Sequence, residues 1–249
     1  MLYHFASRCV RHSFLSGLDP DTGEDLGHRQ QWFIERLNFL AQYFAVDLYG
    51  FRIMHNHFHL ALFHDPKAHL RWTDDDVVDR WLAVSPPKTC GRKLLTPVFP
   101  AEHRKALLAD QERLTHVRRA LGSVSTFMKF LKQGIARRAN QEQGTMGHFF
   151  EQRLWASAVL TDRAVASTMQ YIDLNPVRAI IARRLEEIRA AGIAARLAHL
   201  EADPRSLERY LKPAPSEPGS AWAVVPISLR SYIEQMEVIS DIRHPEGQR

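Results

Sequence analysis

The chain has 249 residues, of which 45% are hydrophobic and 24% charged, a composition typical of a globular protein and not of a disordered one. Lys and Arg exceed Asp and Glu by 33 to 28, and this modest basic excess suits a polyanionic partner such as nucleic acid. The two cysteines, Cys9 and Cys90, exclude a disulfide framework and favour a reducing cytosol. Because no long apolar run or signal-peptide pattern is present, we expect a cytoplasmic protein without a membrane partner.

The first part of the chain predicts a strand, a helix and a β-hairpin. Residues 3–10 alternate between apolar and polar side chains, as a strand does. Residues 28–44 predict an amphipathic helix, because apolar side chains recur every three or four positions at Phe33, Leu37, Leu40 and Phe44. Residues 46–54 and 57–63 then predict two strands with a very short connection, which indicates an antiparallel hairpin.

The remainder of the chain is mainly helical by the same criteria. Prolines interrupt residues 65–100, which we interpret as an insertion with one short helix. The pattern beyond it predicts helices over 102–121 and 123–141, a turn and a strand over 144–160, a helix over 163–174 with Asp162 as its N-cap, and a last helix over 228–238.

Strands combined with long crossover helices predict an α+β fold. We expect a ferredoxin-like sandwich, with helices on the faces of an antiparallel sheet. The expected domain covers residues 1–190, and a mixed C-terminal extension covers 191–249.

The sharpest local motif is MHNHFHLALF, residues 54–63. In a strand, His57 and His59 point to one face, whereas Phe58, Leu60 and Leu62 point to the other. Two imidazoles on one face can bind a single divalent metal ion, although paired histidines at a sheet surface need no metal. His55 is most simply an exposed turn residue.

A second motif is QYIDLNPVRA, residues 170–179. In a helix, Tyr171 and Asn175 would share a face one turn apart and offer a phenol and an amide to a neighbouring site. A structural interpretation stays open, with Tyr171 a half-buried helix residue and Asn175 a cap for the helix that starts at Pro176.

Basic side chains recur along the predicted helices and could follow a phosphate backbone, although many serve only for solvation. The candidates for DNA contacts are Lys129, Arg137, Arg138 and Arg178.

Together these motifs resemble those of the HUH single-tyrosine transposases, a superfamily of IS200-like transposases. Within this superfamily, the chain is similar to the REP-associated tyrosine transposases. The resemblance covers nearly the whole chain. It is carried by HRQQWFIERL (28–37), MHNHFHLAL (54–62), FMKFLKQGIARRAN (127–140), GHFFEQR (147–153), YIDLNPVRA (171–179) and ISLRSYIEQME (227–237).

The resemblance implies a metal-dependent endonuclease that cuts single-stranded or hairpin DNA and transfers the strand through a 5′-phosphotyrosine. Tyr171 matches the nucleophile, His57 and His59 match the metal ligands, and Asn175 matches a third ligand. The implied cofactor is a divalent metal ion, Mg or Mn. The implied location is the bacterial cytoplasm, in association with the nucleoid. The implied oligomeric state is a monomer or a homodimer.

Two other functions stay open at this point. The chain departs from the family pattern at His55 and Ile180, which leaves room for a domesticated protein that binds hairpin DNA without cutting it. A metal-dependent hydrolase that uses His55, His57 and His59 would further need a carboxylate ligand, which the motif does not supply.

Overall fold

The computed structural model describes residues 1–10, 13–86, 101–175, 193, 210–211 and 225–243. Its centre is an antiparallel sheet with the strand order β2-β3-β1-β4. The four strands are β1 (Leu2–Arg8), β2 (Val46–Ile53), β3 (His57–His64) and β4 (Trp155–Val159). Helix α1 (Arg29–Ala41) connects β1 to β2, and α5 (Val124–Glu142) lies between β3 and β4. This order is the ferredoxin-like arrangement, so the predicted α+β fold is confirmed.

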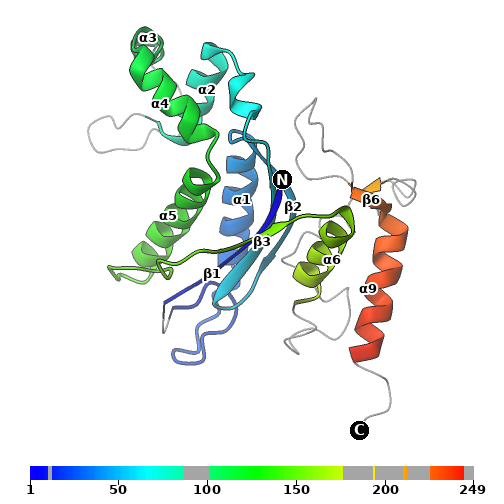
Figure 1. The fold of residues 1–249 in the computed structure, drawn as a ribbon. Helices are drawn as coiled ribbons and strands as arrows, with labels where there is room; N and C mark the ends of the chain where they lie inside the picture. The colour runs from blue at the N-terminus through cyan, green and yellow to red at the C-terminus, as the bar shows by residue number, and fades with distance from the viewer. Residues whose placement is uncertain (11–12, 87–100, 176–192, 194–209, 212–224, 244–249) are drawn as a thin grey trace.

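Helices cover both faces of the sheet, as Figure 1 shows. Helices α1 and α5 pack together on one face, where the predicted apolar stripe of α1 is fully buried at Phe33, Leu37 and Leu40. Helices α6 (Asp162–Asp173) and α9 (Leu229–Arg243) cover the other face. The sheet therefore has an apolar core on each side, and its second face carries the site described below.

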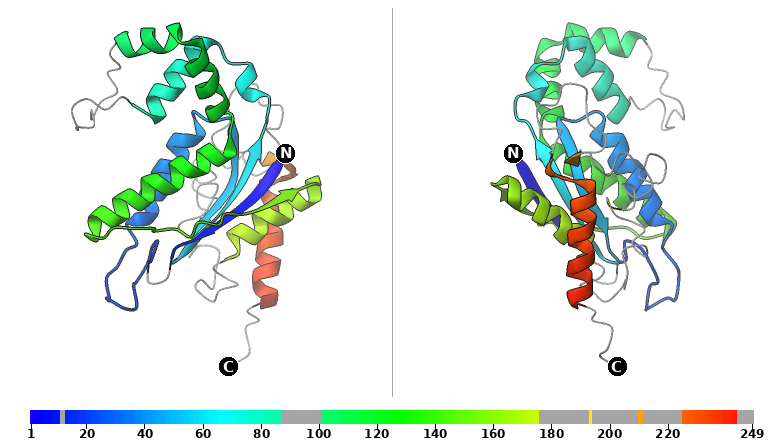
Figure 2. Two further views of the ribbon diagram at one scale, coloured as in Figure 1. Left: turned by 60° about the vertical axis from the view of Figure 1, so that its left-hand side comes forward. Right: turned by 90° about the vertical axis from the view of Figure 1, so that its right-hand side faces the viewer.

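A group of short helices follows β3 and lies at one end of the sheet (Figure 2). It contains η1 (Ala68–Leu70), α2 (Asp74–Val84), α3 (Ala101–Ala109) and α4 (Gln111–Leu121). The single helix predicted over 102–121 is therefore two helices. They break at Asp110, whose carboxylate accepts a hydrogen bond from the backbone N–H of Arg113 and so caps α4.

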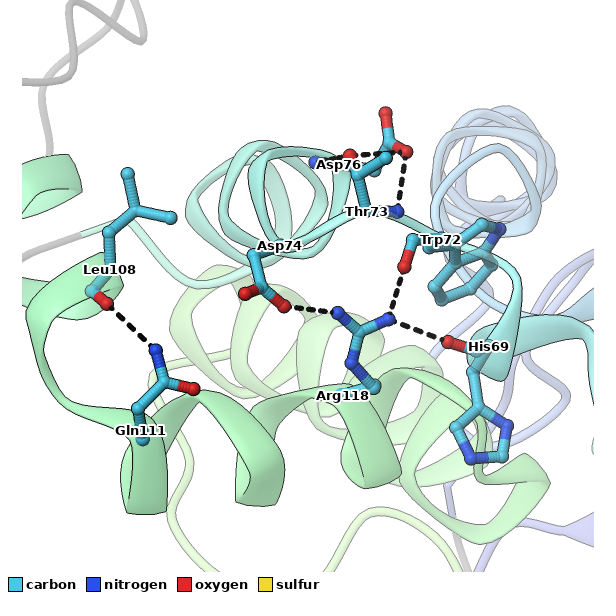
Figure 3. A network of polar contacts seen from close by, with 8 residues as sticks. All are labelled: His69, Trp72, Thr73, Asp74, Asp76, Leu108, Gln111 and Arg118. Atoms are coloured by element: carbon cyan, nitrogen blue, oxygen red, sulfur yellow. Dashed lines mark hydrogen bonds and ion pairs between the residues drawn. The ribbon is translucent and has the colours of Figure 1, made fainter.

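Arg118 connects this group internally (Figure 3). Its guanidinium donates to the backbone carbonyls of His69 and Trp72, and to Asp74 Oδ1 at 2.6 Å. One cation thus joins α4 to η1 and to the start of α2, and it serves packing instead of a ligand.

Two short strands, β5 (Tyr210–Leu211) and β6 (Val225–Ser228), form a separate small sheet before α9. The expected domain boundary near residue 190, and part of the insertion predicted over 65–100, lie outside the described residues. Among the helices that are described, none combines the length and apolar character needed to cross a membrane.

Candidate active site

Strand β3 places two histidines on the face of the sheet that α6 covers. Phe58, Leu60 and Leu62 are fully buried in the core beside α1 and α5. Side chains alternate along a strand, so His57 and His59 point to the opposite face, as the sequence predicts. His57 is half-buried and His59 is buried.

The pairing of the strands sets a row of side chains across this face. Arg52 lies opposite His59, His59 lies opposite Ala6, and Ala6 lies opposite Trp155. These positions come from β2, β3, β1 and β4 in turn, so the row crosses the whole sheet. Arg8 lies opposite His57 in the neighbouring row and is exposed.

A third histidine, which no sequence motif identifies, joins the pair. His4 precedes Ala6 by two residues on β1 and therefore shares its face. The Nε2 atom of His4 lies 3.0 Å from Nδ1 of His59, at hydrogen-bond distance. Local sequence does not mark His4, because its place beside His59 depends on the register of two strands that are far apart in the chain.

Tyr171 reaches this face from helix α6. The helix starts at Thr161, whose hydroxyl accepts from the backbone N–H of Ala164, so the N-cap predicted at Asp162 is one residue too late. Met169 and Ile172 are fully buried against the sheet. Tyr171 is 38% exposed as a residue, and its ring centre lies 5.7 Å from that of His4 and 6.0 Å from that of His59.

The three histidines are neutral at physiological pH. Burial lowers the pKa of His59 to about 3, helped by the neighbouring His57 and His4, and burial lowers the pKa of His4 to about 4. Burial also lowers the pKa of His57, with further contributions from Arg8 and His55. A neutral imidazole keeps a nitrogen lone pair, which is the form that binds metal ions.

The Nδ1 atoms of His57 and His59 each have a hydrogen-bond partner. The Nδ1 atom of His57 lies 2.8 Å from Oδ1 of Asn56, an oxygen that only accepts, so this nitrogen carries the proton. The Nδ1 atom of His59 is engaged by His4. Partners of this kind fix the ring orientation of histidines that bind metals.

The spacing of the two rings fits a shared metal ion. A metal–nitrogen bond of about 2.1 Å puts an imidazole centre about 3.2 Å from the ion, so two ligands at ordinary bond angles have centres about 4.5–5.3 Å apart. The centres of His57 and His59 are 5.1 Å apart. Within the described residues, no group of three His, Cys, Asp or Glu side chains could hold a metal ion.

The other residues of the two motifs lie as follows. Asn175 comes directly after Leu174, the C-cap of α6, and is half-buried. His55 is an exposed turn residue, as expected, and its ring packs on Gly17. A Cβ atom on Gly17 would lie 2.7 Å from that ring, and its φ of +83° favours glycine. Arg178 and Ile180 lie outside the described residues.

A pocket of about 500 Å³ opens above Ala6, and we call it the Ala6 pocket. Strands β1, β3 and β4 form its floor and walls, and helix α6 covers it. Its lining consists of His4, Ala6, His59, Trp155, Ala164, Ser167, Thr168 and Tyr171.

Buried polar contacts fix the C-terminal end of α6, two residues beyond Tyr171. Asp173 is fully buried and accepts hydrogen bonds from the hydroxyl of Tyr232 at 2.7 Å and from the backbone N–H of Ile193. Arg52 is also buried. Burial lowers its pKa to about 10, and the charge of Asp173 opposes this shift. The end of the helix is thereby connected both to β2 and to α9.

Two of the basic residues expected to contact DNA line a cleft of about 580 Å³ along α5. We call it the α5 cleft, and residues 147–154 form its other wall. Lys129 and Arg137 line it, together with Lys132, Gln133 and Asn140. Arg138 points elsewhere, with its guanidinium 3.8 Å from the ring centre of Trp32, where it helps to pack α5 on α1.

No family model and no curated protein sequence matches the chain. Among solved structures, the chain is similar to the REP-associated tyrosine transposase bound to a REP hairpin. The alignment covers 79% of each chain at 11% identity, with a TM-score of 0.45.

Proposed function

We propose that this protein is a metal-dependent endonuclease and strand transferase that cuts single-stranded DNA with Tyr171 as its nucleophile. The main support is the position of Tyr171, which is far from the His57/His59 motif in sequence and yet has its ring 6.0 Å from that of His59. Tyr171 is also partly exposed at the surface. A tyrosine beside a pair of histidines is the arrangement that the resemblance to the HUH single-tyrosine transposases implies.

The residues proposed to hold a divalent ion, Mg²⁺ or Mn²⁺, are His57 and His59 through their Nε2 atoms, with the Asn175 amide as the third ligand. When bound, such an ion would polarise the scissile phosphate and stabilise its developing charge. His4 and Asn56 act as positioning residues, because each engages the Nδ1 atom of one histidine ligand. Arg8 is exposed opposite His57 and is suited to contact the phosphate from outside.

The proposed reaction is a transesterification. The phenol oxygen of Tyr171 loses its proton to the surroundings and attacks the phosphorus in line with the leaving 3′-oxygen. A P–O bond to tyrosine forms, the P–O3′ bond breaks, and the 3′-oxygen takes up a proton. The 5′-phosphotyrosine conserves the energy of the phosphodiester, so a 3′-hydroxyl can reverse the step and join strands without ATP.

The proposed substrate is an unpaired strand or the base of a hairpin, because a phosphate must reach Tyr171 without a complementary strand in the way. Lys129 and Arg137 in the α5 cleft are proposed to contact the DNA backbone. Arg178, outside the described residues, is proposed as a further contact. Arg138 is a weaker candidate, since its guanidinium already stacks on Trp32.

The test is covalent trapping on labelled single-stranded hairpins from the DNA that flanks the gene. With added Mn²⁺, the wild-type protein should form an adduct that survives denaturing electrophoresis, and chelation with EDTA should prevent it. Tyr171→Phe should form no adduct and bind the same hairpin with unchanged affinity, because only the nucleophilic oxygen is removed. Tyr3→Phe is the matched control, since Tyr3 lies on β1 and packs against the core on the opposite face. An adduct with Tyr171→Phe would refute the assignment, whereas wild-type binding without any adduct would support the non-cleaving DNA-binding function.

A further inference from the structure

We propose that the Ala6 pocket receives one unpaired base of the DNA strand, next to the scissile phosphate, and that Trp155 is the platform on which this base stacks. The inference deepens the proposed function and rests on it. It assigns a role in substrate recognition to Trp155, Ala6 and the hydroxyl groups of α6.

The pocket exists because the smallest side chain of the row lies at its centre. Ala6 is paired with His59 on one side and with Trp155 on the other. The two larger side chains therefore stand as walls, and the missing bulk at Ala6 leaves a space beneath α6. Its volume of about 500 Å³ is within the range of about 300–1,000 Å³ that is usual for small-molecule sites.

The lining selects a planar, uncharged group. No Lys, Arg, Asp or Glu is among the described residues that line the pocket, so its walls suit an uncharged group. The rings of His4, Trp155 and Tyr171 surround the space, with the centre of His4 4.9 Å from that of Trp155 and 5.7 Å from that of Tyr171. A nucleobase combines a flat apolar face with polar edges and suits these walls.

The solvent exposure of Trp155 is unusual for a side chain as large and apolar as tryptophan. The residue is 51% exposed on β4, the edge strand of the sheet. Large exposed aromatic side chains that border a pocket are typical of binding sites. Base–aromatic stacking tolerates every base, which makes Trp155 a platform for single strands in general.

Helix α6 supplies the polar groups that would meet the edge of the base. Ser167 and Thr168 line the pocket, and Ser167 donates its hydroxyl proton to the carbonyl of Arg163 at 3.1 Å. The oxygen of Ser167 can therefore still accept a hydrogen bond. Because Tyr171 lies one turn further along the helix and also lines the pocket, a base held here would bring its own phosphate beside the phenol.

The experiment measures binding without cleavage, by fluorescence anisotropy in EDTA. The probes are a fluorescein-labelled oligo-dT strand and a strand of the same length that carries base-free tetrahydrofuran sites. The wild-type protein should bind oligo-dT more tightly than the base-free strand. Trp155→Ala should weaken oligo-dT binding by about 5- to 100-fold, the usual contribution of one stacked base. Its affinity for the base-free strand should stay unchanged, and Trp155→Phe should recover most of the loss.

Ala6→Leu should also weaken oligo-dT binding, because the larger side chain fills the pocket from its floor. Ala156→Leu is its matched control, since Ala156 is exposed on the opposite face of β4, and Leu160→Ala is the control for Trp155→Ala. Circular dichroism checks that each variant is folded, and Trp155→Ala carries the test if Ala6→Leu is not. Equal oligo-dT affinity for Trp155→Ala and Leu160→Ala would overturn the inference, as would equal wild-type affinity for the two strands.

The two proposals fail separately. If the wild-type protein forms the covalent adduct but its affinity for oligo-dT is independent of Trp155, the base pocket is wrong and the endonuclease stands. If binding depends on Trp155 and no adduct forms with any metal, the pocket stands as part of a DNA-binding protein, and the endonuclease is wrong.

Discussion

His4 and His59 form a buried imidazole pair at the centre of the site, with only 8% of each residue exposed. One nitrogen must donate and the other accept across the 3.0 Å contact, so both rings are held in defined orientations while they are neutral. Protonation of either ring would bring a charge into a buried place. The site therefore contains an intrinsic sensitivity to acid.

We predict that the metal-free protein loses stability as the pH falls from about 6.5 towards 4. In this window the unfolded chain takes up protons on His4 and His59, whose ordinary pKa is 6.5, but the folded chain does not, because burial lowers these pKa values to about 4 and about 3. The free energy of unfolding is thus fully retained above pH 6.5. Below it, the loss is up to about 1.4 kcal/mol per pH unit for each histidine.

Urea unfolding in EDTA at several pH values measures this slope. His4→Gln should give a shallower slope than the wild type, because one titrating group is removed. His116→Gln, at an exposed position on α4, should leave the slope unchanged. A stability independent of pH over this window would show that the histidines are not buried in the neutral form.

The positions in the candidate site that sequence predicts are those whose partners are close in the chain. His57 and His59 are found because strand alternation places both on one face, whatever the rest of the fold does. His4 and Trp155 are not found, because each joins the site through strand pairing across long stretches of chain. Arg138 resembles a DNA contact in sequence, yet its cation packs on Trp32.

At the scale of elements, the site depends on how α6 is held over the sheet. Its apolar side chains pack on the sheet and so set the distance between helix and sheet. At its C-terminal end, Asp173 accepts a hydrogen bond from Tyr232 of α9 and interacts with the charge of Arg52. Tyr171 is only two residues from this buried carboxylate. The position of the phenol therefore depends on contacts with β2 and with the C-terminal helix.

We predict that Asp173→Ala lowers the free energy of unfolding by about 3–5 kcal/mol, because it leaves the buried charge of Arg52 without compensation. Tyr232→Phe should cost about 1–2 kcal/mol, since it removes one hydrogen bond and keeps the charges. Urea unfolding at pH 7 measures both. If Asp173→Ala costs no more than Tyr232→Phe, the charge of Asp173 is not what holds the end of α6.

The hairpin, α1 and α5 were predictable as elements because their patterns are long and regular. The boundaries of the elements were less predictable than the elements themselves. Thr161 and Asp162 can both cap a helix, and only the backbone geometry selects Thr161. The break between α3 and α4 at Asp110 could not be predicted from the sequence, because the residues on both of its sides favour helix. The ferredoxin-like arrangement was expected from strands that alternate with long crossover helices, and the order β2-β3-β1-β4 agrees with it.

At the scale of the whole molecule, the α5 cleft and the Ala6 pocket lie on either side of one stretch of chain. Residues 147–154 line the cleft, and Trp155 follows them directly in the pocket. The basic cleft suits a DNA backbone, and the uncharged pocket suits a base. The two surfaces should therefore respond differently to salt.

We predict that Lys129→Ala and Arg137→Ala each weaken binding of single-stranded DNA and each reduce the salt dependence of its affinity. For every phosphate that the variant no longer neutralises, the slope of log K against log salt should become shallower by about 0.7. Trp155→Ala should weaken binding without changing the slope, because stacking releases no counterions. Anisotropy titrations at several salt concentrations measure these slopes. Arg113→Ala, at an exposed position on α4, is the control that removes the same charge elsewhere, and an equal change with it would show a general charge effect.

The row of side chains across the sheet has a consequence for how this chain can tolerate insertions and deletions. A strand has two faces, so a shift of one residue in the pairing of β1 or β3 exchanges them completely. With such a shift in β3, His57 and His59 would enter the core beside α1 and α5, and Phe58 and Leu60 would face α6. A β-bulge can absorb an extra residue, as the register shift between Leu48 and Gly50 in β2 shows. A single-residue insertion that is not absorbed in this way removes the site at once, whereas side-chain substitutions at Ala6 or Trp155 can adjust it by degrees.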